Sequence, residues 1–118
     1  MACSLGYIQL AASAPKVHTC TTTSGTTVNV TLEKYGTETY PFNGVVRLIL
    51  YREASNADAW IKADSKDIGA WNSNGANKNS SFTGLTKGLT YRIVPEFYIA
   101  SNYTNKAGGD ASHIFYQG

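Results

Sequence analysis

Several features that accompany catalysis, membrane insertion or nucleic-acid binding are scarce in this sequence. Its 118 residues include two histidines and two cysteines, and 15% of them are charged. No apolar run approaches the ~20 residues that span a bilayer, so we expect no membrane insertion. The net charge of +2 includes no cluster of Lys or Arg, which argues against nucleic acid or an anionic membrane as a partner.

The sequence also lacks a catalytic constellation. No GxSxG, HExxH, P-loop or GxGxxG pattern occurs, and the acidic residues are scattered. His18 and His113 lie in expected strands among Thr or Ser residues, where a structural role is the expected one. Asp58, Asp64 and Asp67 lie close together but fit no EF-hand loop, so we expect them to be solvated rather than bound to calcium. We therefore predict a protein that is not an enzyme and has no metal or cofactor.

Residues that form strands and turns are abundant instead. Thr, Tyr, Val, Ser, Asn and Gly dominate, and helix-forming residues never recur at helical spacing. With 42% apolar residues, a chain of this length can bury one core without a metal or a disulfide framework. The composition therefore predicts a single all-β domain.

Strand patterns recur at short intervals between Gly, Asn and Ser clusters, a spacing typical of a β-sandwich. In the clearest strand, Val28, Val30 and Leu32 alternate with polar residues. In residues 45–53, the same alternation predicts that Val46, Leu48 and Leu50 face inward. The expected strands are residues 4–10, 16–23, 28–33, 45–53, 59–63, 82–85, 89–100 and 112–117, with loops at 35–44 and 101–110 and a polar stretch leading to residue 81.

The segment GLTKGLTYRIVPEF, residues 84–97, is the most specific part of the sequence. Leu85, Gly88 and Tyr91, with apolar residues at every second position afterwards, resemble the corner between strands E and F of fibronectin type III and related domains. The resemblance implies an immunoglobulin/fibronectin III-like antiparallel β-sandwich, in which the Tyr91 hydroxyl bonds to backbone upstream. Pro95 predicts a bulge or a local edge in this strand. The residues that the resemblance turns toward the core are Tyr91, Ile93, Phe97 and Ile99.

This resemblance covers roughly Pro15 to Tyr116. It departs from the fibronectin pattern at residues 33–35, Glu-Lys-Tyr, where those domains carry a core Trp at the end of strand B. It divides the chain into an N-terminal strand or arm, residues 1–14, and a sandwich domain, residues 15–118. Two placements of the apolar first segment remain open: an extra strand on the domain's own sheet, or an arm that adds a strand to a neighbouring subunit. Because this segment has no basic start and is interrupted by Gly6 and Gln9, we do not expect it to be a signal peptide.

Cys3 and Cys20 form either a disulfide or two buried thiols, and the sequence leaves both alternatives open. Metal binding is not expected, because no CxxC or HxxxH spacing accompanies them. Of the two alternatives we predict the disulfide, which would stabilise the fold by about 3 kcal/mol in the chain-entropy model.

The predicted binding site is the end of the sandwich where the loops 35–44 and 101–110 meet. Tyr supplies contact area at low entropic cost and Asn supplies adaptable hydrogen bonds, a mixture that suits recognition of proteins or sugars. A second candidate is an apolar patch on the outer sheet face around Ile49, Tyr51, Val94 and Tyr98. The alternative is that the long middle stretch with Trp60 and Trp71 covers this patch. The predicted binding residues are Tyr35, Tyr40, Phe42, Asn43, Asn102, Tyr103 and Asn105.

The absence of catalytic motifs and the apolar first segment together favour a structural or interaction module. We expect it to pack against protein subunits of a larger assembly, such as a virion or an extracellular surface structure. The alternative is a secreted or cell-surface recognition domain that binds carbohydrate through the Tyr- and Asn-rich loops.

Overall fold

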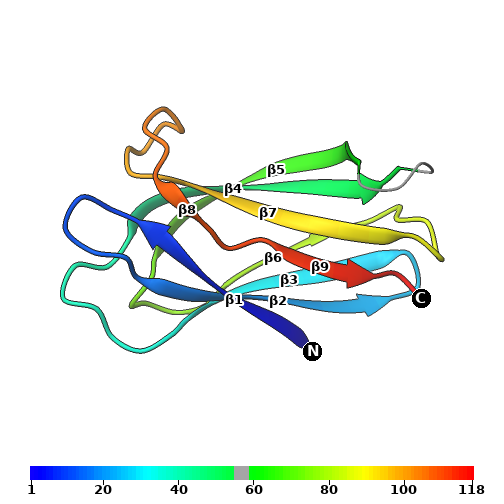
Figure 1. Cartoon of the computed structure of the whole chain (residues 1–118), viewed down its shortest axis with the longest axis horizontal. Coiled ribbons are helices and arrows are strands. Elements are labelled where there is room, and N and C mark those ends of the chain that lie inside the picture. The colour runs from blue at the N-terminus through cyan, green and yellow to red at the C-terminus, as the bar shows by residue number, and fades with distance from the viewer. Residues whose placement is uncertain (55–58) are drawn as a thin grey trace.

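The computed structural model describes residues 1–54 and 59–118 and shows an all-β protein of two antiparallel sheets (Figure 1). Within those ranges, no helix is long and apolar enough to cross a membrane. The described strands, in chain order, are β1 (Ala2–Gln9), β2 (Lys16–Ser24), β3 (Thr27–Lys34), β4 (Asn43–Glu53), β5 (Trp60–Asn72), β6 (Lys78–Phe82), β7 (Thr90–Tyr98), β8 (Gly108–Asp110) and β9 (His113–Tyr116).

The strands form a five-stranded sheet in the order β6-β3-β2-β1-β8 and a four-stranded sheet in the order β5-β4-β7-β9. The last segment of the chain belongs to both sheets. β8 pairs with β1 at Tyr7–Gln9, and the chain then crosses through Ala111 and Ser112 to β9, which pairs with β7. The fold is therefore a β-sandwich whose sheets are joined along one side by this crossing (Figure 1). The predicted all-β sandwich class is confirmed at this level.

Period-two alternation builds the core between the sheets, because successive side chains of a strand point to opposite faces. The side chains predicted to face inward from residues 28–33 and 45–53 are buried, each at most 2% exposed: Val28, Val30, Leu32, Val46, Leu48 and Leu50. The corner before β7 also forms. The buried Tyr91 hydroxyl accepts a hydrogen bond from the backbone N–H of Thr86 at 2.8 Å.

The inward pattern of β7 holds through Phe97 and then fails. Ile99 is 47% exposed, because β7 ends at Tyr98 and the alternation ends with it. Pro95 lies opposite Leu48 of β4, whereas β9 pairs with β7 only over Thr90–Ile93. Pro95 therefore lies where β7 has no strand partner on its other side, the local edge that a strand proline requires.

The middle of the chain differs most from the prediction. A strand was expected only at residues 59–63, yet β5 continues to Asn72, where a polar stretch was expected. β5 is an edge strand with most side chains exposed on both faces, so it carries no apolar alternation that a sequence pattern can detect. β6 ends at Phe82 instead of beginning there. β8 falls inside the expected loop 101–110, because its residues Gly108–Asp110 are turn formers.

The first segment forms β1, which pairs with β2 along Ala2–Tyr7. Cys3 lies directly opposite Cys20 in this ladder, and their sulfur atoms form the predicted disulfide. Cys20 is fully buried while Cys3 is exposed, so the bond links the exposed start of β1 to a buried position in β2.

Candidate functional site

The loops that connect β1 to β2, β3 to β4 and β7 to β8 lie at one end of the sandwich (Figure 1). Hydrogen bonds fix the β3–β4 loop to its neighbours. Ser13 of the β1–β2 loop donates its hydroxyl to the Tyr40 carbonyl. Asn74, which follows β5, accepts the Glu38 N–H at 3.2 Å and donates to the Glu38 carbonyl at 2.8 Å. The end where the site was predicted is therefore held together by side chains from several loops.

Phe42 is not part of a binding surface, contrary to the prediction. It is fully buried, and its ring centroid lies 5.2 Å from that of Phe97 and 6.4 Å from that of Trp71. Its backbone N–H and carbonyl both bond to Ser73, at 2.9 Å each. Phe42 therefore belongs to the core next to β4, because burying an apolar side chain of this size stabilises the fold.

Tyr35, Tyr40 and Asn43 remain accessible. Tyr35 is 48% exposed and meets the edge of the His18 ring at 5.1 Å, and Tyr40 is 60% exposed. Asn43 is exposed and borders a shallow cleft of about 270 Å³ that Ile99 also lines. Exposed aromatic rings suit stacking against a partner, and an exposed amide suits hydrogen bonding.

Tyr103 points away from the loop tip and packs on the outer face of the four-stranded sheet. Its φ of 59° lies in the left-handed region, its hydroxyl accepts the Gly69 N–H at 3.0 Å, and its ring meets Tyr98 at 5.5 Å. The Arg47 guanidinium lies 5.1 Å from the Tyr103 ring centroid and binds the Asp67 carboxylate through two nitrogens. That hydrogen bond raises the pKa of Arg47 and lowers the pKa of Asp67. Tyr103 therefore anchors the β7–β8 loop to the outer face of the four-stranded sheet.

Asn102 and Asn105 are exposed at the loop tip. Asn102 accepts the Thr104 hydroxyl at 2.6 Å, and the Asn105 carbonyl accepts the Ile99 N–H at 2.8 Å. The sequence did not indicate Arg47 or Asp67 at this site, because each is an ordinary outward residue of its strand and only strand pairing makes them neighbours.

The second predicted surface, around Ile49 and Tyr98, is largely covered. Ile49 is 8% exposed and Tyr98 is 7% exposed, while Tyr51 and Val94 are half-buried. Tyr98 donates its hydroxyl to Glu96 at 2.8 Å, and Arg47 and Tyr103 cover its ring. Burial, followed by the hydrogen bond to Glu96, raises the pKa of the Tyr98 hydroxyl.

His113 has structural surroundings. His113 is 5% exposed, and both ring nitrogens are hydrogen-bonded to hydroxyls: Nδ1 to Ser4 at 2.7 Å and Nε2 to Thr21 at 2.9 Å. Burial lowers the pKa of His113. A ring held between two hydroxyl groups fixes β9 against β1 and β2, the structural role expected for it.

One cluster of metal-ligand residues occurs among residues 1–54 and 59–118: Cys3, Cys20 and Glu33, with ligand atoms within 4.8 Å of one another. The two sulfurs are bonded to each other, which leaves one carboxylate and no thiolate for an ion. Of the aspartates considered for calcium, Asp67 forms an ion pair with Arg47, and Asp58 lies outside the described residues.

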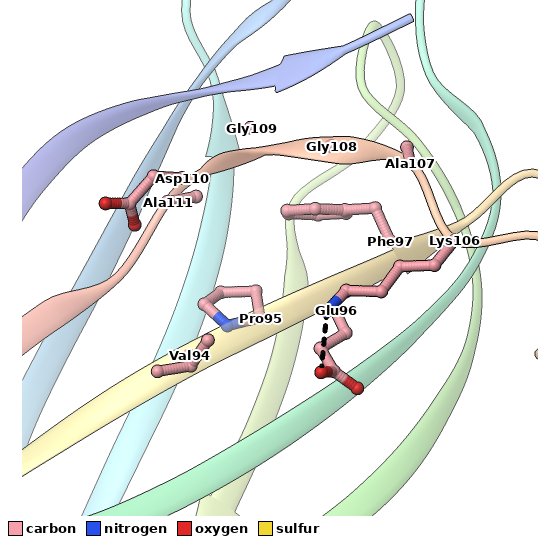
Figure 2. A pocket seen from close by; sticks show the side chains of 10 residues that line it. All are labelled: Val94, Pro95, Glu96, Phe97, Lys106, Ala107, Gly108, Gly109, Asp110 and Ala111. Atoms are coloured by element: carbon pink, nitrogen blue, oxygen red, sulfur yellow. Dashed lines mark hydrogen bonds and ion pairs between the residues drawn. The ribbon is translucent and has the colours of Figure 1, made fainter. Parts of the chain in front are cut away.

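Two clefts lie along the side where the last segment crosses between the sheets. The smaller, of about 60 Å³, lies between residues 94–97 of β7 and residues 106–111, and its mouth carries the ion pair of Lys106 and Glu96 at 3.0 Å (Figure 2). It has room for a few water molecules only. The larger, of about 560 Å³, opens toward the chain termini between β1, β2 and β9. Its lining has no charged side chain: Met1, Ala2, Thr21, Thr22, Thr23, Ile114, Phe115 and Tyr116.

Comparison of the chain with protein-family models, with curated proteins and with solved structures finds no match.

Proposed function

We propose that this chain is a non-enzymatic structural or interaction module that packs into a larger assembly, in a virion or in an extracellular surface structure. The observation that carries the proposal is the large cleft beside β1 and β9. Ile114 and Tyr116 line it and are 56% and 61% exposed, and Met1 at its rim is 79% exposed. Large apolar side chains that gather at one place on a surface, rather than scatter over it, mark contact sites for other proteins.

The absence of enzymatic activity is part of this proposal. Three observations support it: both His113 nitrogens are engaged by hydroxyls, the two cysteines are bonded to each other, and Asp67 is paired with Arg47. Nucleophiles and general bases need a free, suitably activated group beside a cleft. The Cys3–Cys20 disulfide is also compatible with an oxidising, extracellular location.

An immunoglobulin/fibronectin III-like fold belongs to the same proposal. Strand order supports it: β2, β3 and β6 take the places of strands A, B and E, and β4, β7 and β9 take those of C, F and G. The Tyr91 corner before β7 supports it as well. In this interpretation β1 is an addition to the A-B-E sheet, next to strand A.

The assembly is tested by following the native chain, detected with an antibody, through sedimentation of an extract of its source. We expect it to co-sediment with particles many times its mass of 12.7 kDa and to be released when those particles are dissociated by denaturant. Sedimentation of the chain only as a free, small protein would overturn the proposal.

The loop end supports the second candidate, a recognition domain that binds carbohydrate. The 60% exposure of Tyr40, with exposed Tyr35 in the same loop and exposed Asn43 at the start of β4, favours it, because sugars stack on exposed aromatic rings and bond to amides. A glycan array probed with the parent chain tests it. A bound glycan that is lost in Tyr40→Ala and kept in Tyr116→Ala, at the other end of the sandwich, would support this function, and an array without any bound glycan would refute it.

A further inference from the structure

The backbone of β1 presents an unused edge beyond β8. The Ile8 N–H donates to the Pro15 carbonyl at 2.9 Å, so even-numbered residues of β1 direct their backbone groups toward β2. Odd-numbered residues direct theirs the opposite way, where β8 covers only Tyr7–Gln9. No strand in the described ranges pairs with this side of Cys3 and Leu5. Their N–H and carbonyl groups are therefore available to another strand.

β9 has a matching free edge on the same side of the sandwich. The Gln117 N–H donates to the Leu89 carbonyl at 3.0 Å, so odd-numbered residues of this segment face β7. Ile114 and Tyr116 direct their backbone groups away from β7, and β9 is the last strand of its sheet. The hydrogen bond between Ser4 and His113 places the two free edges next to each other.

The edges of β5 and β6 carry features that prevent strand addition. β5 bears Lys62, Asp64 and Lys66, and its pairing with β4 is interrupted by two register shifts. β6 begins with Lys78, and the Lys66 ammonium donates to the Ser81 carbonyl. Charges, bulges and covered carbonyls of this kind protect edge strands against pairing.

By contrast, residues 2–6 and 113–116, Ala-Cys-Ser-Leu-Gly and His-Ile-Phe-Tyr, contain no Lys, Arg, Asp, Glu or Pro. Leu5 is 53% exposed and Ile114 is 56% exposed. These two edges therefore lack the charges and prolines that protect edge strands against pairing.

We propose that a second copy of this chain pairs with these edges, β1 with β1 and β9 with β9, in a twofold-symmetric dimer. The inference rests on the proposed function, whose interaction surface it specifies. A twofold axis perpendicular to the sheets makes both pairings antiparallel at once, so one interface extends both sheets across the two copies. Symmetry also brings residues near the axis close to their own counterparts, so a charge there would repel itself. Uncharged edges are the ones that suit self-pairing.

The test measures the mass of the purified, oxidised full chain by size-exclusion chromatography with light scattering over a range of concentrations. We expect the parent to have twice the mass of one 12.7 kDa chain. Leu5→Lys and Ile114→Lys place like charges across the twofold axis and should each raise the dimer dissociation constant at least about tenfold. Ile61→Lys, at a 41% exposed position on the protected β5 edge, is the matched control and should leave the dimer unchanged.

Amide hydrogen exchange of the parent chain gives a second readout that needs no variant. Protection of the Leu5 and Ile114 amides should rise with protein concentration. The Ser4 and Phe115 amides bond within each sheet, so they should be protected at every concentration. A monomeric parent chain up to about 1 mM, the concentration range of very weak complexes, would overturn the dimer. So would a dimer that resists both edge variants, or exchange that does not depend on concentration. A monomer that still co-sediments with large native particles would refute this dimer and leave the proposed function standing.

Discussion

Replacing Tyr91 by Phe tests whether the corner before β7 stabilises the fold. The substitution removes one hydroxyl and keeps the ring, which is 3% exposed and stacks on Phe115 with 5.7 Å between centroids. The lost hydroxyl accepts the Thr86 N–H at 2.8 Å. A donor left without its partner costs about 1–3 kcal/mol, and because Thr86 is exposed, water can replace part of the bond. We therefore expect the free energy of unfolding to fall by about 1–1.5 kcal/mol.

This loss corresponds to a measurable change in melting temperature. The entropy of unfolding is about 2.1 cal/mol/K per residue, or about 0.25 kcal/mol/K for a chain of 118 residues. The expected decrease in Tm is therefore about 4–6 °C. Urea titrations followed by fluorescence should give a lower midpoint with an unchanged m-value, which indicates a change in stability alone.

The control variant is Tyr116→Phe, since Tyr116 is 61% exposed and the structure gives its hydroxyl no hydrogen bond among the described residues. We expect its stability to stay within about 0.5 kcal/mol of the parent. If Tyr91→Phe were as stable as Tyr116→Phe, the hydroxyl would contribute nothing to the corner, and the resemblance at this segment would lose its physical basis.

Three further predictions concern the core and its links. Reducing the Cys3–Cys20 bond, whose cysteines are 17 positions apart, should lower the free energy of unfolding by about 3 kcal/mol, measured as a lower urea midpoint in dithiothreitol. Burial lowers the pKa of His113 from its usual 6.5, so as the pH falls the unfolded chain takes up this proton first. Its contribution to stability is complete above about pH 6.5 and is lost progressively below it, and His113→Gln should flatten this part of a pH series of urea midpoints. Trp71→Ala should cost about 3–5 kcal/mol in the same titration, because Trp71 is buried against both Phe42 and Phe97.

Each of these expectations has a contrary result. Equal midpoints with and without reductant would mean that the β1–β2 ladder alone holds the first strand. An unchanged pH profile in His113→Gln would mean that the loss of stability below about pH 6.5 comes from another group. A cost below about 1 kcal/mol for Trp71→Ala would mean that the site collapses without a cavity.

Some elements could be predicted from the sequence because their signal is local. Val28, Val30 and Leu32 alternate with polar residues, and alternation is a direct consequence of a strand with one face in the core. The segment from Leu85 to Tyr91 could be interpreted for a similar reason, since the corner bond joins residues five positions apart.

Elements without an apolar face could not be predicted in this way. β5 is an edge strand whose backbone bonds to β4, while its side chains Lys62, Asp64 and Asp67 face solvent. The distinction between Phe42 and Tyr40 is also tertiary. Both are aromatic residues of one polar loop, and only the positions of Trp71 and Phe97 decide which of them enters the core.

By itself, the sequence determined that this is an all-β chain whose core is built from alternate side chains of its strands. Apolar residues at every second position specify which side chains are buried. It also determined which two cysteines could pair. Only the tertiary structure decided that Tyr103 folds back onto Arg47, and that β1 and β9 share one open side. Those features depend on contacts between residues far apart in the chain, such as Ser4 and His113, which are 109 positions apart. No local pattern encodes them, because their energy arises only when the two sheets have already packed together.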